Sequence, residues 1–108
     1  MRYRVDVAPV PGLRRRADIL FSRDRIAVFI DGCFWHGCPE HGPTRFDTNA
    51  DYWVPKIAEN RARDLDTSAR FEAAGWTVLR FWAHTAPSSA AETVIAAVKR
   101  ERAQREQA

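Results

Sequence analysis

The chain has 108 residues, of which 45% are hydrophobic and 29% are charged, and its formal net charge at pH 7 is +3. This length and composition are typical of one small domain, residues 1–108, with a core small enough that a bound metal ion would help to stabilise it. No apolar stretch reaches the roughly 18 residues of a membrane-spanning helix and no hydrophobic signal core follows Met1, so we expect a cytoplasmic protein without membrane contact. We also expect a monomer, although the sequence has no feature that fixes the oligomeric state.

The first half of the chain predicts three strands and a long loop. Alternating polar and apolar residues at 3–7 predict a short strand, which ends at the proline- and glycine-rich turn 9–12. The apolar runs 17–21 and 26–30 predict two further strands joined by a polar turn, and the second is expected at the centre of the sheet because its β-propensity is the highest of the chain. Residues 33–51 follow no helical or strand period and are expected to form a long loop.

The second half predicts a helix, a strand and a helix. The first helix is expected to begin near Pro55 and to end at Gly75, because proline is common in the first turn and glycine just after the last. Its buried face is expected to be the apolar stripe at helical spacing, Ala58, Ala62, Leu65, Ala69 and Ala73. Residues 76–82 predict the last strand, and the helix that precedes it predicts a parallel pairing with strand 26–30.

The end of the chain predicts a second helix. Ser89 and Glu92 have the spacing of a capping box, which places the start of this helix at Ser89. The charged tail, residues 99–108, is expected to fray. Together these elements predict an α/β fold in which helices flank a mixed β-sheet.

Side chains that bind zinc gather at two places in the sequence. They are Cys33, His36, Cys38 and His41, within the predicted loop, and His84, after the last predicted strand. If the predicted strands 26–30 and 76–82 are parallel neighbours, their ends bring the five side chains close together. A zinc site takes four ligands, so one of the five would be surplus. Cys33, Cys38, His41 and His84 would form a closed structural site and leave His36 free, and the alternative is that none of them binds a metal.

Two aspartates and three arginines suggest an enzyme that acts on a polyanion. Asp18 lies within a predicted apolar strand and Asp31 ends the next, so the two carboxylates can approach at one sheet edge and offer oxygen ligands to magnesium. The alternative is that Asp18 pairs with one of the arginines that precede it, Arg14, Arg15 or Arg16. An exposed arginine run can bind nucleic-acid phosphates, but it can also be an ordinary solvated surface.

A longer set of motifs resembles one family. The string Gly32-Cys33-Phe34-Trp35-His36 is followed by Cys38, His41, Tyr52-Trp53, Lys56-Ile57, Asn60, Arg63-Asp64 and Ala74 to Arg80. Over roughly residues 2–85, this pattern resembles the very short patch repair (Vsr) DNA mismatch endonucleases. The resemblance implies a restriction-endonuclease-like fold with a structural zinc. It also implies an enzyme that nicks one DNA strand beside a T:G mismatch.

The resemblance also implies a role for individual residues. Asp18 and the backbone carbonyl of Ile30 would bind catalytic magnesium. His36 would be the general base, or would orient the attacking water through a metal-bound partner, and Asp64 would orient His36. Asp31 stands where family members often carry a histidine, and we expect it to belong to the catalytic site. The zinc ligands would be Cys33, Cys38, His41 and His84.

The remaining implied residues would contact the substrate, double-stranded DNA with a T:G mismatch. Phe34, Trp35 and Trp53 would insert into the base stack, and Arg14, Arg15 and Arg16 would contact the backbone. The resemblance further suggests association with the nucleoid and with other mismatch-repair proteins. Family members usually carry an N-terminal helical segment that this sequence lacks. Two alternatives therefore stay open: a zinc-stabilised DNA-binding module without cleavage, and a related nuclease of different DNA specificity.

Overall fold

The computed structural model describes residues 2–32 and 50–107. Its centre is a four-stranded sheet with the order β1-β2-β3-β4, formed by β1 (Arg4–Val7), β2 (Ala17–Phe21), β3 (Ile26–Asp31) and β4 (Thr77–Trp82). β2 is antiparallel to both β1 and β3, whereas β3 and β4 are parallel. The four predicted strands and the parallel pair are confirmed, with boundaries that differ by at most one residue. Most of the predicted loop, residues 33–49, lies outside the described part of the chain.

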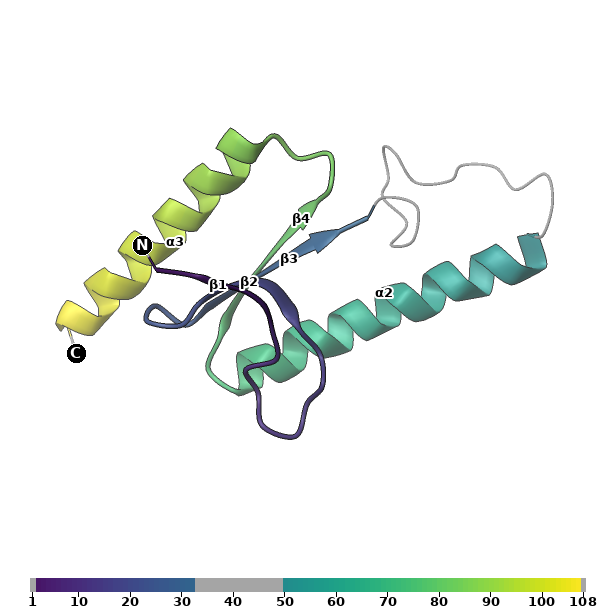
Figure 1. Ribbon diagram of the computed structural model, residues 1–108, viewed down its shortest axis with the longest axis horizontal. Helices are drawn as coiled ribbons and strands as arrows, with labels where there is room; N and C mark the ends of the chain where they lie inside the picture. The colour runs from purple at the N-terminus through teal and green to yellow at the C-terminus, as the bar shows by residue number, and fades with distance from the viewer. Residues whose placement is uncertain (1, 33–49, 108) are drawn as a thin grey trace.

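Two helices cover opposite faces of this mixed sheet (Figure 1), α2 (Ala50–Ala73) and α3 (Pro87–Gln107). On the α2 side, Phe71 is completely buried and packs edge-to-face against Phe29 of β3. On the α3 side, Val98 packs with Ile26 and Val28 of β3. Full burial of a side chain as large as Phe71 contributes about 1.5–3 kcal/mol to folding. The predicted α/β architecture, a mixed sheet flanked by helices, is therefore confirmed.

The end of α2 is fixed by a glycine and by a contact from the β2–β3 turn. Gly75 has a φ of +93°, and its N–H donates to the carbonyl of Glu72, while the N–H of Trp76 donates to the carbonyl of Phe71. These two bonds are the Schellman pattern, which satisfies carbonyls that the helix leaves unpaired. The guanidinium of Arg25 stacks over the Trp76 ring, 4.4 Å from its centroid, and so joins the β2–β3 turn to the end of α2. The predicted helix end at Gly75 is confirmed.

The face that α2 turns to the sheet differs from the predicted one. The whole alanine–leucine stripe is exposed, and Leu65 is 74% exposed. Among the side chains of the helix that the structure describes, Thr67 and Phe71 are buried, and partly buried polar residues such as Asp64 and Ser68 lie on the same side. The predicted buried face was wrong because the face of α2 that packs on the sheet contacts the charged side chain of Arg80 as well as the apolar core around Phe71. The helix also begins before Pro55, at Ala50.

α3 also departs from the sequence-based prediction at its start. It begins at Pro87, where a fixed φ suits the first helical position, so Ser89 lies inside the first turn instead of capping it. It continues through Gln107, so residues 99–107 belong to the helix. Hydrogen bonds to Asp24 from Arg102 (3.2 Å) and Arg105 (2.8 Å) hold this end of the helix on the sheet.

Asp24 is a buried charge in the turn between β2 and β3. It is 3% exposed, and burial raises the pKa of its carboxyl, but the hydrogen bonds from Arg102 and Arg105 outweigh burial and hold that pKa below its usual value. The pair of arginines thus keeps a carboxylate ionised inside the fold. No sequence period could reveal this contact because the partners lie about 80 positions apart.

Candidate active site

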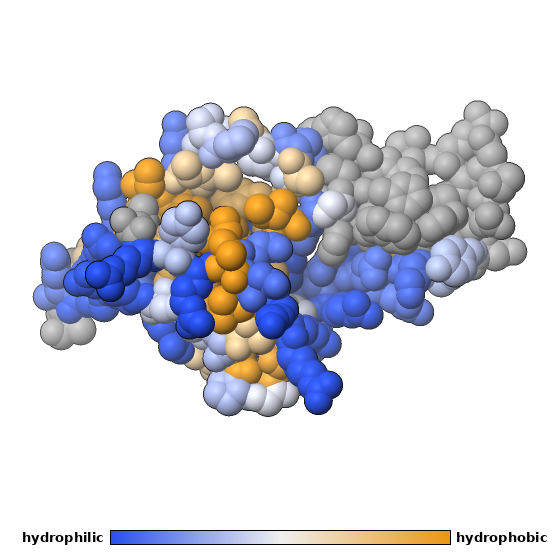
Figure 2. Space-filling view, in the orientation of Figure 1, coloured by the Kyte–Doolittle hydropathy of each residue, from blue (hydrophilic) through white to orange (hydrophobic). Residues whose placement is uncertain are grey.

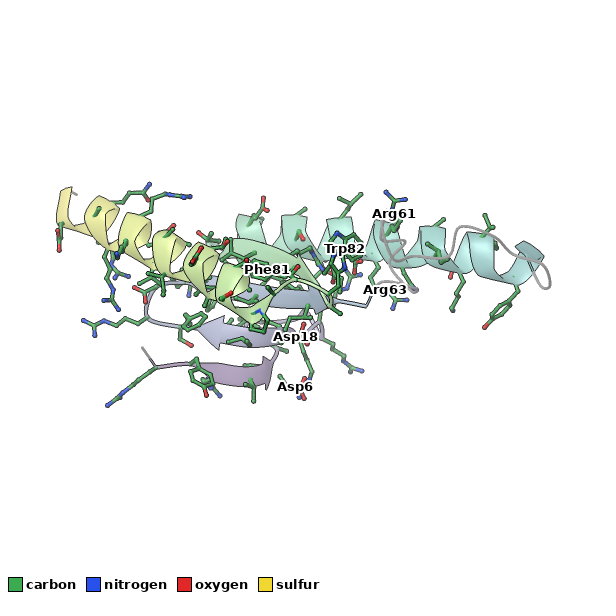
Figure 3. The ribbon with its side chains drawn as sticks, turned by 90° about the horizontal axis from the view of Figure 1, so that it is seen from above. Asp6, Asp18, Arg61, Arg63, Phe81 and Trp82 are labelled. Atoms are coloured by element: carbon green, nitrogen blue, oxygen red, sulfur yellow. The ribbon has the colours of Figure 1, made fainter. Side chains whose placement is uncertain are left out.

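The strand ends define one functional edge of the sheet. β3 and β4 finish side by side, with Asp31 opposite Trp82 and the N–H of Ala83 donating to the Asp31 carbonyl at 2.9 Å. β2 is antiparallel to β3 and starts at this same edge, which brings Asp18 there. Figure 3 shows Asp18 and Trp82 at this end of the sheet. The prediction that Asp18 and Asp31 share one edge is therefore confirmed.

Asp18 is held by the backbone of the neighbouring strand. Its Oδ2 accepts a hydrogen bond of 2.7 Å from the N–H of Ile30, and its side chain is exposed. The alternative prediction, a pairing with one of the three preceding arginines, is not observed in the described residues. In a strand the N–H and the carbonyl of one residue point to the same side, so the Ile30 carbonyl faces the side of β3 on which Asp18 lies. A carboxylate and a carbonyl oxygen are thus directed to one position.

This pair fits a hard divalent cation that takes few ligands from the protein. Within residues 2–32 and 50–107, no group of three or more histidine, cysteine or acidic side chains could enclose a metal ion. Magnesium is commonly bound through one or two carboxylates and keeps several waters, with substrate phosphates completing its shell. The oxygen donors of Asp18 and Ile30 suit such a cation, whereas a metal that needs a complete protein cage does not fit them.

Asp31 and Asp64 are both held by an arginine that the sequence analysis missed. Arg80, in the middle of β4, donates to Asp31 Oδ1 at 2.9 Å, to the backbone carbonyl of Asp64 at 3.0 Å and to Ser68 Oγ at 2.8 Å. Its guanidinium also lies 3.8 Å from Asp64 Oδ1 and stacks over the ring of Phe29 at 4.4 Å. The signal that could have revealed it is the single charge inside the apolar run of residues 76–82.

A small polar cleft opens between α2 and the end of β4. Its lining includes Arg61, Asp64, Ser68, Arg80 and Trp82, and Figure 3 shows Arg61 beside Trp82. A second groove, about 490 Å³ in volume, runs between α3 and the opposite face of the sheet. The described residues that line this second groove are apolar apart from Thr85, so it offers no acid, base or metal ligand. Among the described residues of these two openings, the charged side chains therefore line the cleft on the α2 side.

The three predicted DNA-contacting arginines have different surroundings. Arg15 donates to Thr67 Oγ1 at 2.9 Å and to Asp66, and its hydrogen bond holds the pKa of the Asp66 carboxyl below its usual value. Arg16 pairs with Asp6 at 3.6 Å and bonds its carbonyl. Arg14 is exposed and makes no hydrogen bond or ion pair to another described residue. Two of the three side chains thus hold the fold, and Arg14 is the one that faces solvent unengaged.

Several predicted site residues lie outside the described part of the chain: Cys33, Phe34, Trp35, His36, Cys38 and His41, together with the side chain of Trp53. Of the predicted zinc ligands, only His84 is described. It is exposed in the turn that directly follows β4, at the same edge as Asp31.

The outer surface is divided between apolar and polar regions. Figure 2 shows apolar side chains over the middle of one face, between the hydrophilic surfaces of α2 and of the C-terminal part of α3. Neither helix, over its described residues, has the length and apolar character needed to cross a bilayer.

A mixed sheet with a helix on each face and a carboxylate at the strand ends fits the restriction-endonuclease-like class of α/β proteins. Comparison of the sequence with protein families gives a match over residues 1–40 to the family described as DNA mismatch endonuclease Vsr. The Type II nicking enzyme V.NaeI of Lentzea aerocolonigenes is 45% identical over 86 residues, which cover 78% of this chain and 50% of that protein. The DNA mismatch endonuclease Vsr of Escherichia coli is 34% identical over 85 residues, which cover 76% of this chain and 51% of that protein.

A further relative, the Type II nicking enzyme V.NmeDIP of Neisseria meningitidis serogroup C, is 36% identical over 85 residues, 78% of this chain and 55% of that protein. Through these matches the chain is similar to the Vsr family over about three quarters of its length. It spans about half the length of the curated relatives that it matches.

Proposed function

We propose that this protein is a magnesium-dependent DNA endonuclease that nicks one strand of a duplex beside a T:G mismatch. The observation that carries the proposal is the Asp18 carboxylate, exposed at the functional edge and fixed by the Ile30 N–H at 2.7 Å. The relatives support it because their names describe nicking enzymes and a mismatch endonuclease.

The proposed magnesium ligands are Asp18 and the carbonyl of Ile30. When bound there, the cation would supply a Lewis acid for the scissile phosphate and a water of lowered pKa. Asp18 keeps its position because one carboxylate oxygen is engaged by the backbone, which leaves the other available as a ligand.

Proton transfer is assigned to His36 and its orientation to Asp64. An imidazole nitrogen of His36 would accept the proton of the attacking water, and the Asp64 carboxylate would hold the other nitrogen and so fix the tautomer. Asp64 is partly buried on the side of α2 that faces the sheet, where Arg80 bonds its backbone carbonyl. Asp31, which we also assign to the catalytic site, contacts Arg80 and would act through it.

Contact with DNA is assigned to aromatic and basic side chains. Phe34, Trp35 and Trp53 would unstack the mismatched pair, where unstacking costs least. Arg14 is the phosphate contact that we favour, because Arg15 and Arg16 are engaged by Asp66 and Asp6.

A structural zinc site would stabilise the functional edge. Cys33, Cys38, His41 and His84 form a two-cysteine, two-histidine donor set, which suits tetrahedral zinc and leaves no coordination position for water. Zinc in such a site would hold the fold and take no part in the reaction.

A related nuclease of different DNA specificity is the second candidate. It is favoured by the names of relatives such as V.NaeI and V.NmeDIP, which describe Type II nicking enzymes without naming a mismatch.

The test compares nicking of T:G, matched and single-stranded DNA with magnesium. We expect cleavage of one strand of the T:G duplex and its loss in Asp18→Asn. The matched control is Asp6→Asn, because Asp6 lies at the same end of the sheet but pairs with Arg16 and is 79% exposed at its side chain. Equal cleavage of matched and mismatched duplexes would favour the second candidate. Binding of the T:G duplex without cleavage would identify a DNA-binding module instead.

A further inference from the structure

Arg80 connects three elements at the functional edge. It lies on β4, and its side chain is 22% exposed. Three of its hydrogen bonds reach out of its own strand, one to Asp31 at the end of β3 and two to Asp64 and Ser68 on α2. A guanidinium carries five N–H donors in a fixed plane, so these bonds define one arrangement of the three elements.

Arg80 has two acceptors on α2, the side-chain Oγ of Ser68 and the backbone carbonyl of Asp64, four residues earlier. In an α-helix the carbonyl of one residue points toward the residue four positions later, so both acceptors lie beside Ser68. Since Arg80 bonds both, it fixes the axial position of α2 as well as its rotation relative to the sheet. Asp31 in turn accepts from the same guanidinium at 2.9 Å and holds it at the end of β3. The Arg80 guanidinium thus sets the distance between the middle of α2 and β3, the strand that carries Ile30.

We propose that Arg80 is a positioning residue of the active site, which sets the place of Asp64 relative to the Asp18–Ile30 pair. The inference rests on the proposed function because that function assigns Asp64 and Asp18 to the reaction. In this role Arg80 acts through Asp64, whose backbone carbonyl it bonds, and takes no direct part in the reaction. Asp31 acts as the anchor of Arg80, which gives this predicted catalytic residue an indirect role.

Arg80 also contributes to stability, because the side chain of its partner Asp31 is 13% exposed and would be left without a compensating charge if Arg80 were removed. An apolar side chain could keep the contact with the Phe29 ring. It could not supply the ordered geometry of the three hydrogen bonds that join β3, β4 and α2.

The test uses Arg80→Met, which keeps the length of the stem and its contact with Phe29, and Arg80→Lys, which keeps the charge but loses the planar fork. We expect single-turnover nicking of a T:G duplex to fall by about tenfold or more in Arg80→Met, since small displacements of catalytic groups cost this much. We expect DNA affinity to change by less than about threefold, because a positioning residue affects the reaction step and not ground-state binding. Arg80→Lys is expected to recover part of the rate.

The matched control is Arg70→Met, because Arg70 is an exposed arginine of α2 that pairs with Asp66, away from the edge. Wild-type nicking by Arg80→Met would overturn the proposal, and so would a parallel loss of rate and affinity. Ser68→Ala, which removes one contact without changing charge, is the second variant if Arg80→Met does not fold. It is expected to slow nicking less than Arg80→Met and to leave affinity unchanged, and a wild-type rate would count against the proposal.

A measurement without activity separates this inference from the proposed function. Hydrogen exchange of residues 61–68 of α2 is expected to quicken in Arg80→Met and to stay unchanged in Arg70→Met. If the wild-type protein nicks no DNA, the proposed function fails. Independently of that result, hydrogen exchange that is unchanged in both Arg80→Met and Arg70→Met would overturn the positioning role of Arg80.

Discussion

The Asp18 carboxylate and the Ile30 N–H are joined by a hydrogen bond of 2.7 Å across the β2–β3 pair. Their strands are antiparallel, so the start of one meets the end of the other, and a side chain at the first strand's start reaches the backbone at the second strand's end. This bond orients an exposed carboxylate without a second charged residue. The Ile30 carbonyl faces the same side as its N–H, so the arrangement is consistent with the proposal that the two oxygens bind a hard cation.

Asp18→Asn is expected to abolish nicking without loss of the fold. The amide removes the negative charge but keeps an oxygen that can accept from Ile30, so stability should be close to that of the wild type. Loss of several kcal/mol of transition-state stabilisation corresponds to a rate decrease of about 100-fold or more. Single-turnover nicking and thermal melting are measured on the same preparation. Substantial nicking by Asp18→Asn would remove this residue from the metal site.

Asp64→Asn is expected to slow nicking by on the order of tenfold and to leave the fold intact. Arg80 bonds the backbone carbonyl of Asp64, and the substitution preserves this bond. What changes is the carboxylate proposed to fix the His36 tautomer. The measurement is the nicking rate together with the circular dichroism spectrum. An unchanged rate would exclude Asp64 from the mechanism.

The strands could be predicted from the sequence because each is a compact apolar run between turn residues. Ile26–Asp31 is the clearest case, with four buried residues in succession. The end of α2 was equally predictable, because Gly75 at a positive φ is a local requirement that needs no distant partner. These predictions rest on backbone geometry and on burial, which short sequence patterns record.

The face of α2 and the role of Arg80 could not be predicted in this way. Hydrophobic periodicity assumes that a helix turns its apolar side to the sheet. Here Asp64 and Ser68 face the sheet because they meet Arg80, whereas Leu65 faces solvent. The partners of Arg80 lie 12 to 49 positions away, so only the tertiary fold connects them.

Arg14→Ala is expected to weaken DNA binding more than Arg16→Ala does. Arg14 is exposed without a described partner, whereas Arg16 is engaged by Asp6. Loss of one phosphate contact should reduce the slope of log affinity against log salt by about 0.9. Fluorescence anisotropy with a labelled T:G duplex over a salt series measures both slopes. An unchanged slope in Arg14→Ala would show that this residue does not contact phosphate.

Stability is expected to fall in acid because of Asp24. The hydrogen bonds from Arg102 and Arg105 hold its folded-state pKa below the unfolded value of about 3.9. The stabilisation is therefore complete above the unfolded pKa and is lost as pH falls through the folded one. Urea unfolding at pH 7 and at pH 3 measures the difference.

Asp24→Asn should lower stability at pH 7 by about 1–3 kcal/mol, since two arginines lose a buried charged partner. It should also reduce the loss of stability between pH 7 and pH 3. Asp6→Asn is the control, because the Asp6 side chain is 79% exposed. A pH dependence equal to that of the wild type would show that Asp24 is not the group responsible.

Removal of zinc is expected to unfold the functional edge and to stop nicking indirectly. The proposed ligands Cys33, Cys38 and His41 follow β3 in the sequence, and His84 directly follows β4, so the metal would join the segments that leave the two parallel strands. We expect one zinc ion per chain by elemental analysis, retained under dialysis that removes magnesium. Cys38→Ser and His84→Ala should each lower Tm by more than about 10 °C, because a structural site contributes several kcal/mol. Asp18→Ala should change Tm little, since that carboxylate is exposed and is assigned to the proposed magnesium site instead. A metal-free protein with an unchanged Tm would contradict the structural site, because a tetrahedral zinc that contributes no stability would have no remaining role in this fold.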